Sequence, residues 1–151
     1  MALIADYLDR MIVNTILVAV DGSPASVQAA RMAVGFAHDH VSKVVVLVFS
    51  NCEEGDSART SSRCDEARDS AHLIGEYALN ARIPCEMNVL RCERPAEEIA
   101  AEATRRHCDL IWLAAPAETS DVPCFLDADV AVEVLGRVDV PVMLFRSRTP
   151  A

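Results

Sequence analysis

The chain has 151 residues and a formal net charge of −9, with 52% hydrophobic and 25% charged residues. This size and composition predict one globular domain with its own core, and no apolar run reaches the roughly 20 residues of a membrane-spanning helix. The 23 acidic against 14 basic residues oppose attraction to nucleic acid or anionic lipid. We therefore expect neither nucleic acid nor membrane as a partner.

The first ten residues do not resemble a secretory signal. They include Asp6 and Asp9, and they lack both a basic start and a long apolar stretch. We therefore expect a cytoplasmic protein.

The cysteines are scattered, and a core of this size needs no disulfide bonds. No two have Cys-x-x-Cys spacing; the six are Cys52, Cys64, Cys85, Cys92, Cys108 and Cys124. We expect mostly buried or inert thiols. His107 next to Cys108, and His38 with His40, point apart on a helix end, so no metal site is expected.

The first predicted elements are a strand and a helix joined by a tight turn. Thr15–Val20 is a short β-branched and apolar run that ends at Asp21-Gly22-Ser23-Pro24. Ser23 is suited to cap a helix and Pro24 to occupy its first position. The apolar face of this helix comprises Val27, Ala30, Val34 and Ala37.

The next strand is predicted to be internal to a sheet. Val44 to Phe49 is apolar at every position, which is typical of a strand buried on both faces of a parallel sheet. A polar loop is predicted from Asn51 to Ser62. Helical spacing then resumes at Ala67, Ala71, Ile74 and Ala78.

The second half repeats the alternation of strand and helix. Cys85 to Leu90 is a strand, and a helix follows from Pro95 with Arg105, Arg106 and His107 in its last turn. The remaining elements are a strand at Leu110–Ala114, a helix at Val130–Leu135 and a strand at Val142–Phe145.

This order predicts an α/β fold with a five-stranded parallel sheet, doubly wound, in three layers α/β/α. Ligands of such folds bind at the carboxyl ends of the strands. The candidate positions here are the turn at Asp21, the end of the second strand near Phe49, and the loop after Ala114.

Three stretches resemble the universal stress protein family. They are Ile16-Leu-Val-Ala-Val-Asp-Gly-Ser23, Arg94-Pro-Ala-Glu-Glu-Ile99 followed by Ala103, and Asp109-Leu-Ile111 leading to Val140-Pro-Val-Met-Leu-Phe145. The resemblance implies a Rossmann-like fold of the adenine nucleotide alpha hydrolase kind. It divides the chain into an N-terminal extension at residues 1–11, the domain at 12–147 and a tail at 148–151.

Many members of that family bind ATP. The resemblance implies an acidic residue near the adenosine, here Asp21, and a G-x-x-G-x9-G-[ST] loop around the phosphates. Glycines in such a loop let backbone N–H groups approach the phosphates and form a nest at a helix start.

This chain departs from that loop. Ala114 and Ala117 stand at the first two glycine positions, and Pro116 has no N–H to donate. The third glycine and its hydroxyl partner fall on Ala128 and Asp129, or on Asp127 and Ala128 with a one-residue shift. Either alignment puts a carboxylate where phosphate would arrive, at a cost of roughly 1 kcal/mol per charge pair at 4 Å in water.

Two explanations of these aspartates stay open: they replace the phosphates, or they are ordinary helix caps. If a nucleotide binds at all, its candidate contacts are Asp21, Gly22, Ser23, Phe49, Leu113, Ala114, Ala117, Ala128 and Asp129. Asp21 is equally explained by turn chemistry. Glu93, where the family usually has glycine, indicates that the turn after the third strand is altered too.

No catalytic motif is present, so we expect no enzyme and no cofactor. Trp112 is expected in the core. The leading hypothesis is a regulatory stress-response module with a degenerate phosphate loop. The alternatives are a sensor of ATP or AMP and a thiol redox sensor, the latter motivated by Cys52 and Cys124, although nearby acidic residues disfavour thiolates.

Dimerisation through the last strand is implied by the resemblance. An apolar edge strand tends to be covered or paired. We therefore expect a homodimer that pairs the strand Val142, Met143, Leu144 and Phe145 with its own copy. The N-terminal extension places Leu3, Ile4, Tyr7, Leu8 and Met11 on one helical face, suited to a partner or to simple packing.

Overall fold

The computed structural model describes residues 13–50, 57–115 and 126–146. Five parallel strands form one sheet in the order β3-β2-β1-β4-β5. The strands are β1 (Thr15–Val20), β2 (Lys43–Phe49), β3 (Cys85–Leu90), β4 (Leu110–Ala115) and β5 (Val142–Arg146). The helices are α2 (Pro24–His40), α3 (Ser57–Asn80), α4 (Pro95–Arg105) and α5 (Ala128–Arg137).

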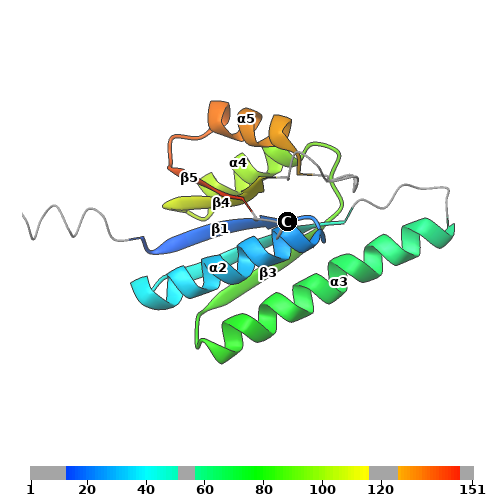
Figure 1. The fold of residues 1–151 in the computed structure, drawn as a ribbon. Helices are drawn as coiled ribbons and strands as arrows, with labels where there is room; N and C mark the ends of the chain where they lie inside the picture. The colour runs from blue at the N-terminus through cyan, green and yellow to red at the C-terminus, as the bar shows by residue number, and fades with distance from the viewer. Residues whose placement is uncertain (1–12, 51–56, 116–125, 147–151) are drawn as a thin grey trace, which may run out of the picture.

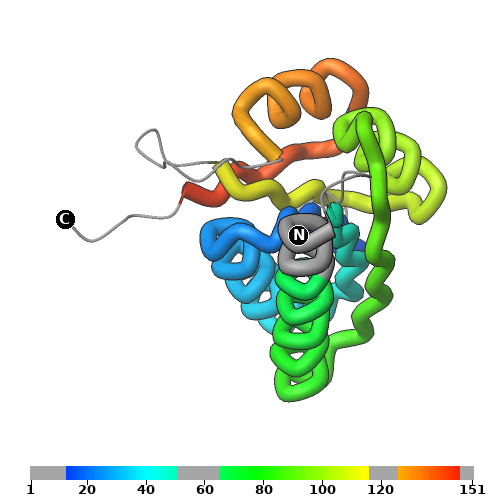
Figure 2. The backbone as a smooth tube through the Cα atoms, turned by 90° about the vertical axis from the view of Figure 1, so that its right-hand side faces the viewer, coloured from blue at the N-terminus to red at the C-terminus, as the bar shows by residue number. Residues whose placement is uncertain are grey.

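The sheet has helices on both faces, as the sequence predicts. Helices α2 and α3 lie on one face and α4 and α5 on the other (Figure 1). The same three layers are visible from the side (Figure 2). The chain winds outward from β1 through β2 to β3 and then crosses to β4 and β5, so β1 and β4 meet at the topological switch point.

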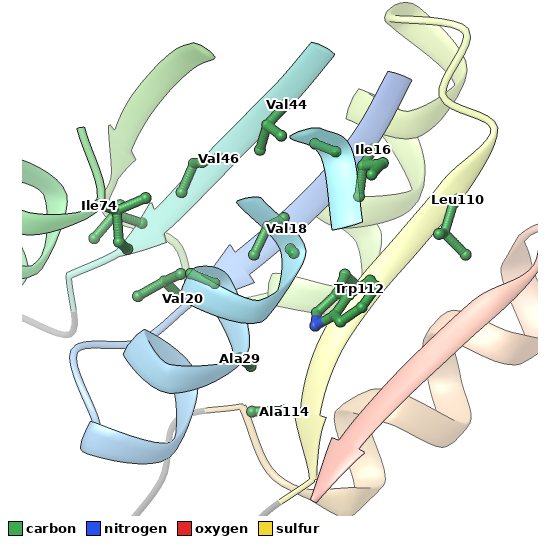
Figure 3. Close-up of a cluster of buried hydrophobic side chains, with 14 of the residues drawn as sticks. Ile16, Val18, Val20, Ala29, Val44, Val46, Ile74, Leu110, Trp112 and Ala114 are labelled. Atoms are coloured by element: carbon green, nitrogen blue, oxygen red, sulfur yellow. The ribbon is translucent and has the colours of Figure 1, made fainter. Parts of the chain in front are cut away.

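Alternate residues of the strands build two cores. Ile16, Val18 and Trp112 face α2 and α3 in one cluster (Figure 3). Leu17, Ile111 and their neighbours pack against α4 and α5 in the other. Residues 16–20 of β1 and 44–49 of β2 are buried throughout, which confirms the prediction that β2 is internal. Trp112 is 6% exposed and belongs to the core.

The bounds of several helices differ from the sequence prediction; α5 runs from Ala128 to Arg137, two residues longer at each end than predicted. Helix α3 begins at Ser57, inside the loop predicted from Asn51 to Ser62. The prediction is wrong for residues 57–62, because this stretch is polar but residues 56–66 contain neither Gly nor Pro to prevent a helix.

Helix α4 contains only the first of the three residues predicted for its last turn, Arg105. Arg106 and His107 lie beyond Arg105, the last residue of the helix. His107 has a φ of 51°, and the next N–H, of Cys108, donates to Ala103 O at 2.9 Å. A residue in the left-handed conformation followed by this 6→1 hydrogen bond is the Schellman motif, which terminates a helix.

None of the helices in the described ranges has the length and apolarity to cross a bilayer.

Candidate functional site

The turn after β1 begins the site at the carboxyl end of the sheet. Gly22 has a φ of 84°, a conformation that glycine adopts without strain. Ser23 caps α2, because its Oγ accepts from the N–H of Ser26 at 3.2 Å. The N–H of Asp21 donates to Ser26 Oγ at 3.2 Å, which joins the end of β1 to the first turn of α2. The predicted Ser23 cap is confirmed.

The carboxylate of Asp21 joins this turn to a distant segment. Its Oδ1 accepts from the N–H of Ser23 at 3.0 Å, and its Oδ2 accepts from the N–H of Leu126 at 3.2 Å. Leu126 is 5% exposed and packs in the core cluster of α4 and α5. Both carboxylate oxygens of Asp21 are therefore occupied by backbone donors of the chain itself.

Helix α5 starts immediately after Leu126. Asp127 is its N-cap, and its Oδ1 accepts from the N–H of Val130 at 3.0 Å. Asp129 lies in the first turn of the helix, and both aspartates are exposed. Carboxylates at this position interact favourably with the helix dipole. The start of α5 thus has two negative charges of its own at the helix end that favours anions.

The other predicted contacts that the structure describes are buried side chains of the two cores. Phe49 and Leu113, at 1% and 3% exposure, pack in the same core cluster as Leu126. Ala114 is 8% exposed and belongs to the opposite cluster. Pro116 and Ala117 lie outside the described residues. The residues brought together at the site are Asp21, Gly22, Ser23, Leu126, Asp127, Ala128 and Asp129.

A comparison with protein families identifies the chain's relatives. The sequence profile of the universal stress protein family matches residues 13–146. The chain belongs to this family. The match spans every described strand and helix of the domain, and it confirms the family resemblance. No curated protein sequence matches the chain significantly.

Solved universal stress proteins have the same fold. One from Burkholderia pseudomallei aligns over 91% of this chain and 98% of its own, with 18% identity and a TM-score of 0.69. One from Archaeoglobus fulgidus in complex with dAMP aligns over 89% and 98%, with 19% identity and a TM-score of 0.61. One from Arabidopsis thaliana with AMP bound aligns over 89% and 92%, with 14% identity and a TM-score of 0.57.

Leu126 is the site residue that sequence reasoning missed. Its contribution is a backbone N–H, which carries no signature in the side chain, and its partner Asp21 is 105 residues away. The available signal is an apolar residue just before a capping aspartate, a position that often packs against the fourth residue of the helix. In the described part of the chain, no three His, Cys, Asp or Glu side chains group as metal ligands.

We predict that Asp21→Asn weakens the attachment of the segment before α5. An amide offers one acceptor oxygen where the carboxylate offers two, so one of the two N–H groups loses its charged partner, at a cost of about 1–2 kcal/mol. The free energy of unfolding, followed by Trp112 fluorescence, should fall by that amount, and amide exchange at Leu126 should accelerate about tenfold.

Asp109→Asn is the matched control. Asp109 Oδ2 accepts from the N–H groups of Asn14 and Thr15, both at 2.9 Å, at the opposite end of β1. This variant should also lose stability without selective acceleration at Leu126. Unchanged exchange at Leu126 in Asp21→Asn would show that the hydrogen bond does not hold the segment.

Proposed function

We propose that this universal stress protein is a non-enzymatic regulatory module of the stress response that does not hold ATP phosphates. The observation that carries the proposal is the set of carboxylates at the start of α5. Asp127 satisfies the N–H of Val130, and Asp21 satisfies that of Leu126. Two backbone donors at the start of α5 are therefore already bound to the chain's own carboxylates.

Charge supports the same conclusion. Three carboxylates lie close to the start of α5. Asp21 accepts from the N–H of Leu126, the residue next to Asp127, and Asp129 follows in the first turn of the helix; we call this the α5 junction. Bringing a triphosphate to this junction sets its charges against carboxylates, at roughly 1 kcal/mol per pair at 4 Å in water and more where water is displaced. The helix dipole is already neutralised by Asp127 and Asp129.

A second candidate is an adenine-nucleotide sensor for ATP or AMP. It is favoured by the relatives whose structures contain dAMP and AMP, and by the presence of Asp21 and Gly22 at the turn after β1. A monophosphate has less negative charge than ATP and is repelled less by the aspartates of α5. In this alternative, the nucleotide must displace Leu126 from Asp21 or bind beside their hydrogen bond.

A thiol sensor has less support from the described residues. Burial, reinforced by Asp109, raises the pKa of Cys108 to about 11, and burial with the charge of Glu86 raises the pKa of Cys85. Both thiols are thereby kept protonated near neutral pH, where the thiolate is the reactive form. Cys52 and Cys124, which motivated this alternative, lie outside the described residues.

We predict that calorimetry of the purified protein with Mg²⁺ and ATP gives no binding tighter than about 1 mM. The double variant Asp127→Ser/Asp129→Asn keeps a capping hydroxyl and removes two charges, and it should strengthen the binding of ATP at least about fivefold. Glu133→Gln, an exposed change on the same helix, is the control and should leave affinity unchanged.

A micromolar affinity of the unaltered protein for ATP would overturn the proposal. If AMP binds with micromolar affinity and ATP does not, the proposal of a regulatory module gives way to that of a nucleotide sensor.

Dimerisation through β5 is part of the proposal. Strand β5 is an edge of the sheet, and its Met143 and Leu144 are 43% and 46% exposed. Val142 and Phe145 pack inward on the two core clusters. An apolar, half-exposed edge of this kind favours pairing with a second copy about a two-fold axis, which would extend the sheet and cover both side chains.

We predict that the protein sediments as a dimer at about 10 µM and that Leu144→Lys shifts it to a monomer, because lysine on an edge strand opposes pairing. Val89→Lys is the matched control: Val89 is 50% exposed on β3, the opposite edge. A monomeric parent protein, or equal dissociation by both variants, would exclude β5 as the interface.

A further inference from the structure

An apolar groove runs between α3 and the edge strand β3, away from the site at the carboxyl end. It is open to solvent and has a volume of about 620 Å³. Its apolar lining includes Ala71, Gly75, Leu79, Ile83, Cys85 and Met87. Gly75 leaves room in the groove, since a Cβ added there would meet only Met87 Cε, at 4.0 Å.

Two strongly exposed apolar side chains lie near the ends of α2 and α3. Leu79, in the groove, is 77% exposed, and Val41, after the end of α2, is 89% exposed. These are the highest exposures among the large apolar side chains of the described ranges. The ends of α2 and α3 lie together, because His38 Nδ1 hydrogen-bonds Ala81 O at 3.1 Å. Exposed apolar side chains gathered beside an apolar groove indicate a docking site.

The described chain begins next to this surface. Asn14 O accepts from the N–H of Lys43 at 2.8 Å, and Pro84 O accepts from the N–H of Val44 at 2.9 Å. Residues 14 and 84 therefore flank β2, about 10 Å apart across two strand spacings. Val13 packs on the same core cluster as Ile83, Cys85 and Met87, so all four lie on the same face of the sheet.

We propose that residues 1–12 of the same chain cover the groove between α3 and β3. Twelve residues reach about 18 Å even as a helix, which exceeds the distance from residue 13 to the groove. The segment also supplies apolar side chains at helical spacing: Leu3, Ile4, Tyr7, Leu8 and Met11. An apolar helical face laid in a groove is a recurrent mode of recognition, and a covalently attached segment binds at high effective concentration.

Cys85 provides a direct readout because it lines the groove and is only partly buried. The full-length protein is alkylated with N-ethylmaleimide, and the rate at each cysteine is read by peptide mass spectrometry. Ile4→Ser/Tyr7→Ser removes apolar groups from the segment, and Leu79→Gln removes one from the groove. Each variant should accelerate Cys85 at least about fivefold relative to Cys92, since undocking exposes the thiol.

Two controls separate docking from general loosening. Asp6→Asn/Asp9→Asn alters the opposite face of the segment, and Met32→Gln alters an exposed apolar residue that does not line the groove. Neither should change the Cys85 rate.

Three results would overturn the proposal. The first is an unchanged Cys85 rate in both test variants. The second is an acceleration shared by buried Cys108, which indicates opening of the fold. The third is protection of Cys85 that disappears when the protein is diluted, which assigns the groove to a second copy.

Discussion

The carboxylate of Asp21 is the constraint on which the site depends. It closes the turn after β1 through Ser23 and holds the segment before α5 through Leu126. These two hydrogen bonds join the turn after β1 to the segment that precedes α5. Both lie near the switch point between β1 and β4. Because Leu126 is buried in the core of α4 and α5, the position of the helix start is fixed by packing as well as by charge.

In the proposed function, this constraint makes the start of α5 poorly suited to phosphate. A helix N-terminus binds anions through free N–H groups and its dipole. Here Asp127 accepts from the N–H of Val130 in the first turn, Asp21 accepts from that of Leu126 just before the helix, and Asp129 adds a further charge. The structure shows Asp127 as a cap of α5. In the proposed function, the same carboxylate also stands in for phosphate, because it occupies a donor that a phosphate would use.

Most of the fold could be predicted from the sequence, because buried parallel strands read as continuous apolar runs and the Ser23 cap has a clear signature. The start of α3 could not, since a polar stretch without Gly or Pro is compatible with either a loop or a solvent-facing helix. At the site, Asp21 and Asp127 were recognisable as acidic turn and cap residues. Their connection through Leu126 was not, because backbone hydrogen bonds over 105 residues follow from tertiary packing rather than from local sequence.

The central claim is that the chain's own carboxylates occupy the donors of a phosphate site. It is tested most directly by nuclear magnetic resonance of the amide groups of Leu126 and Val130 during titration with ATP and Mg²⁺. If Asp21 and Asp127 retain these donors, both amide resonances stay in place at millimolar nucleotide. A saturable shift of both resonances at micromolar ATP would mean that phosphate displaces the carboxylates, and it would contradict the account.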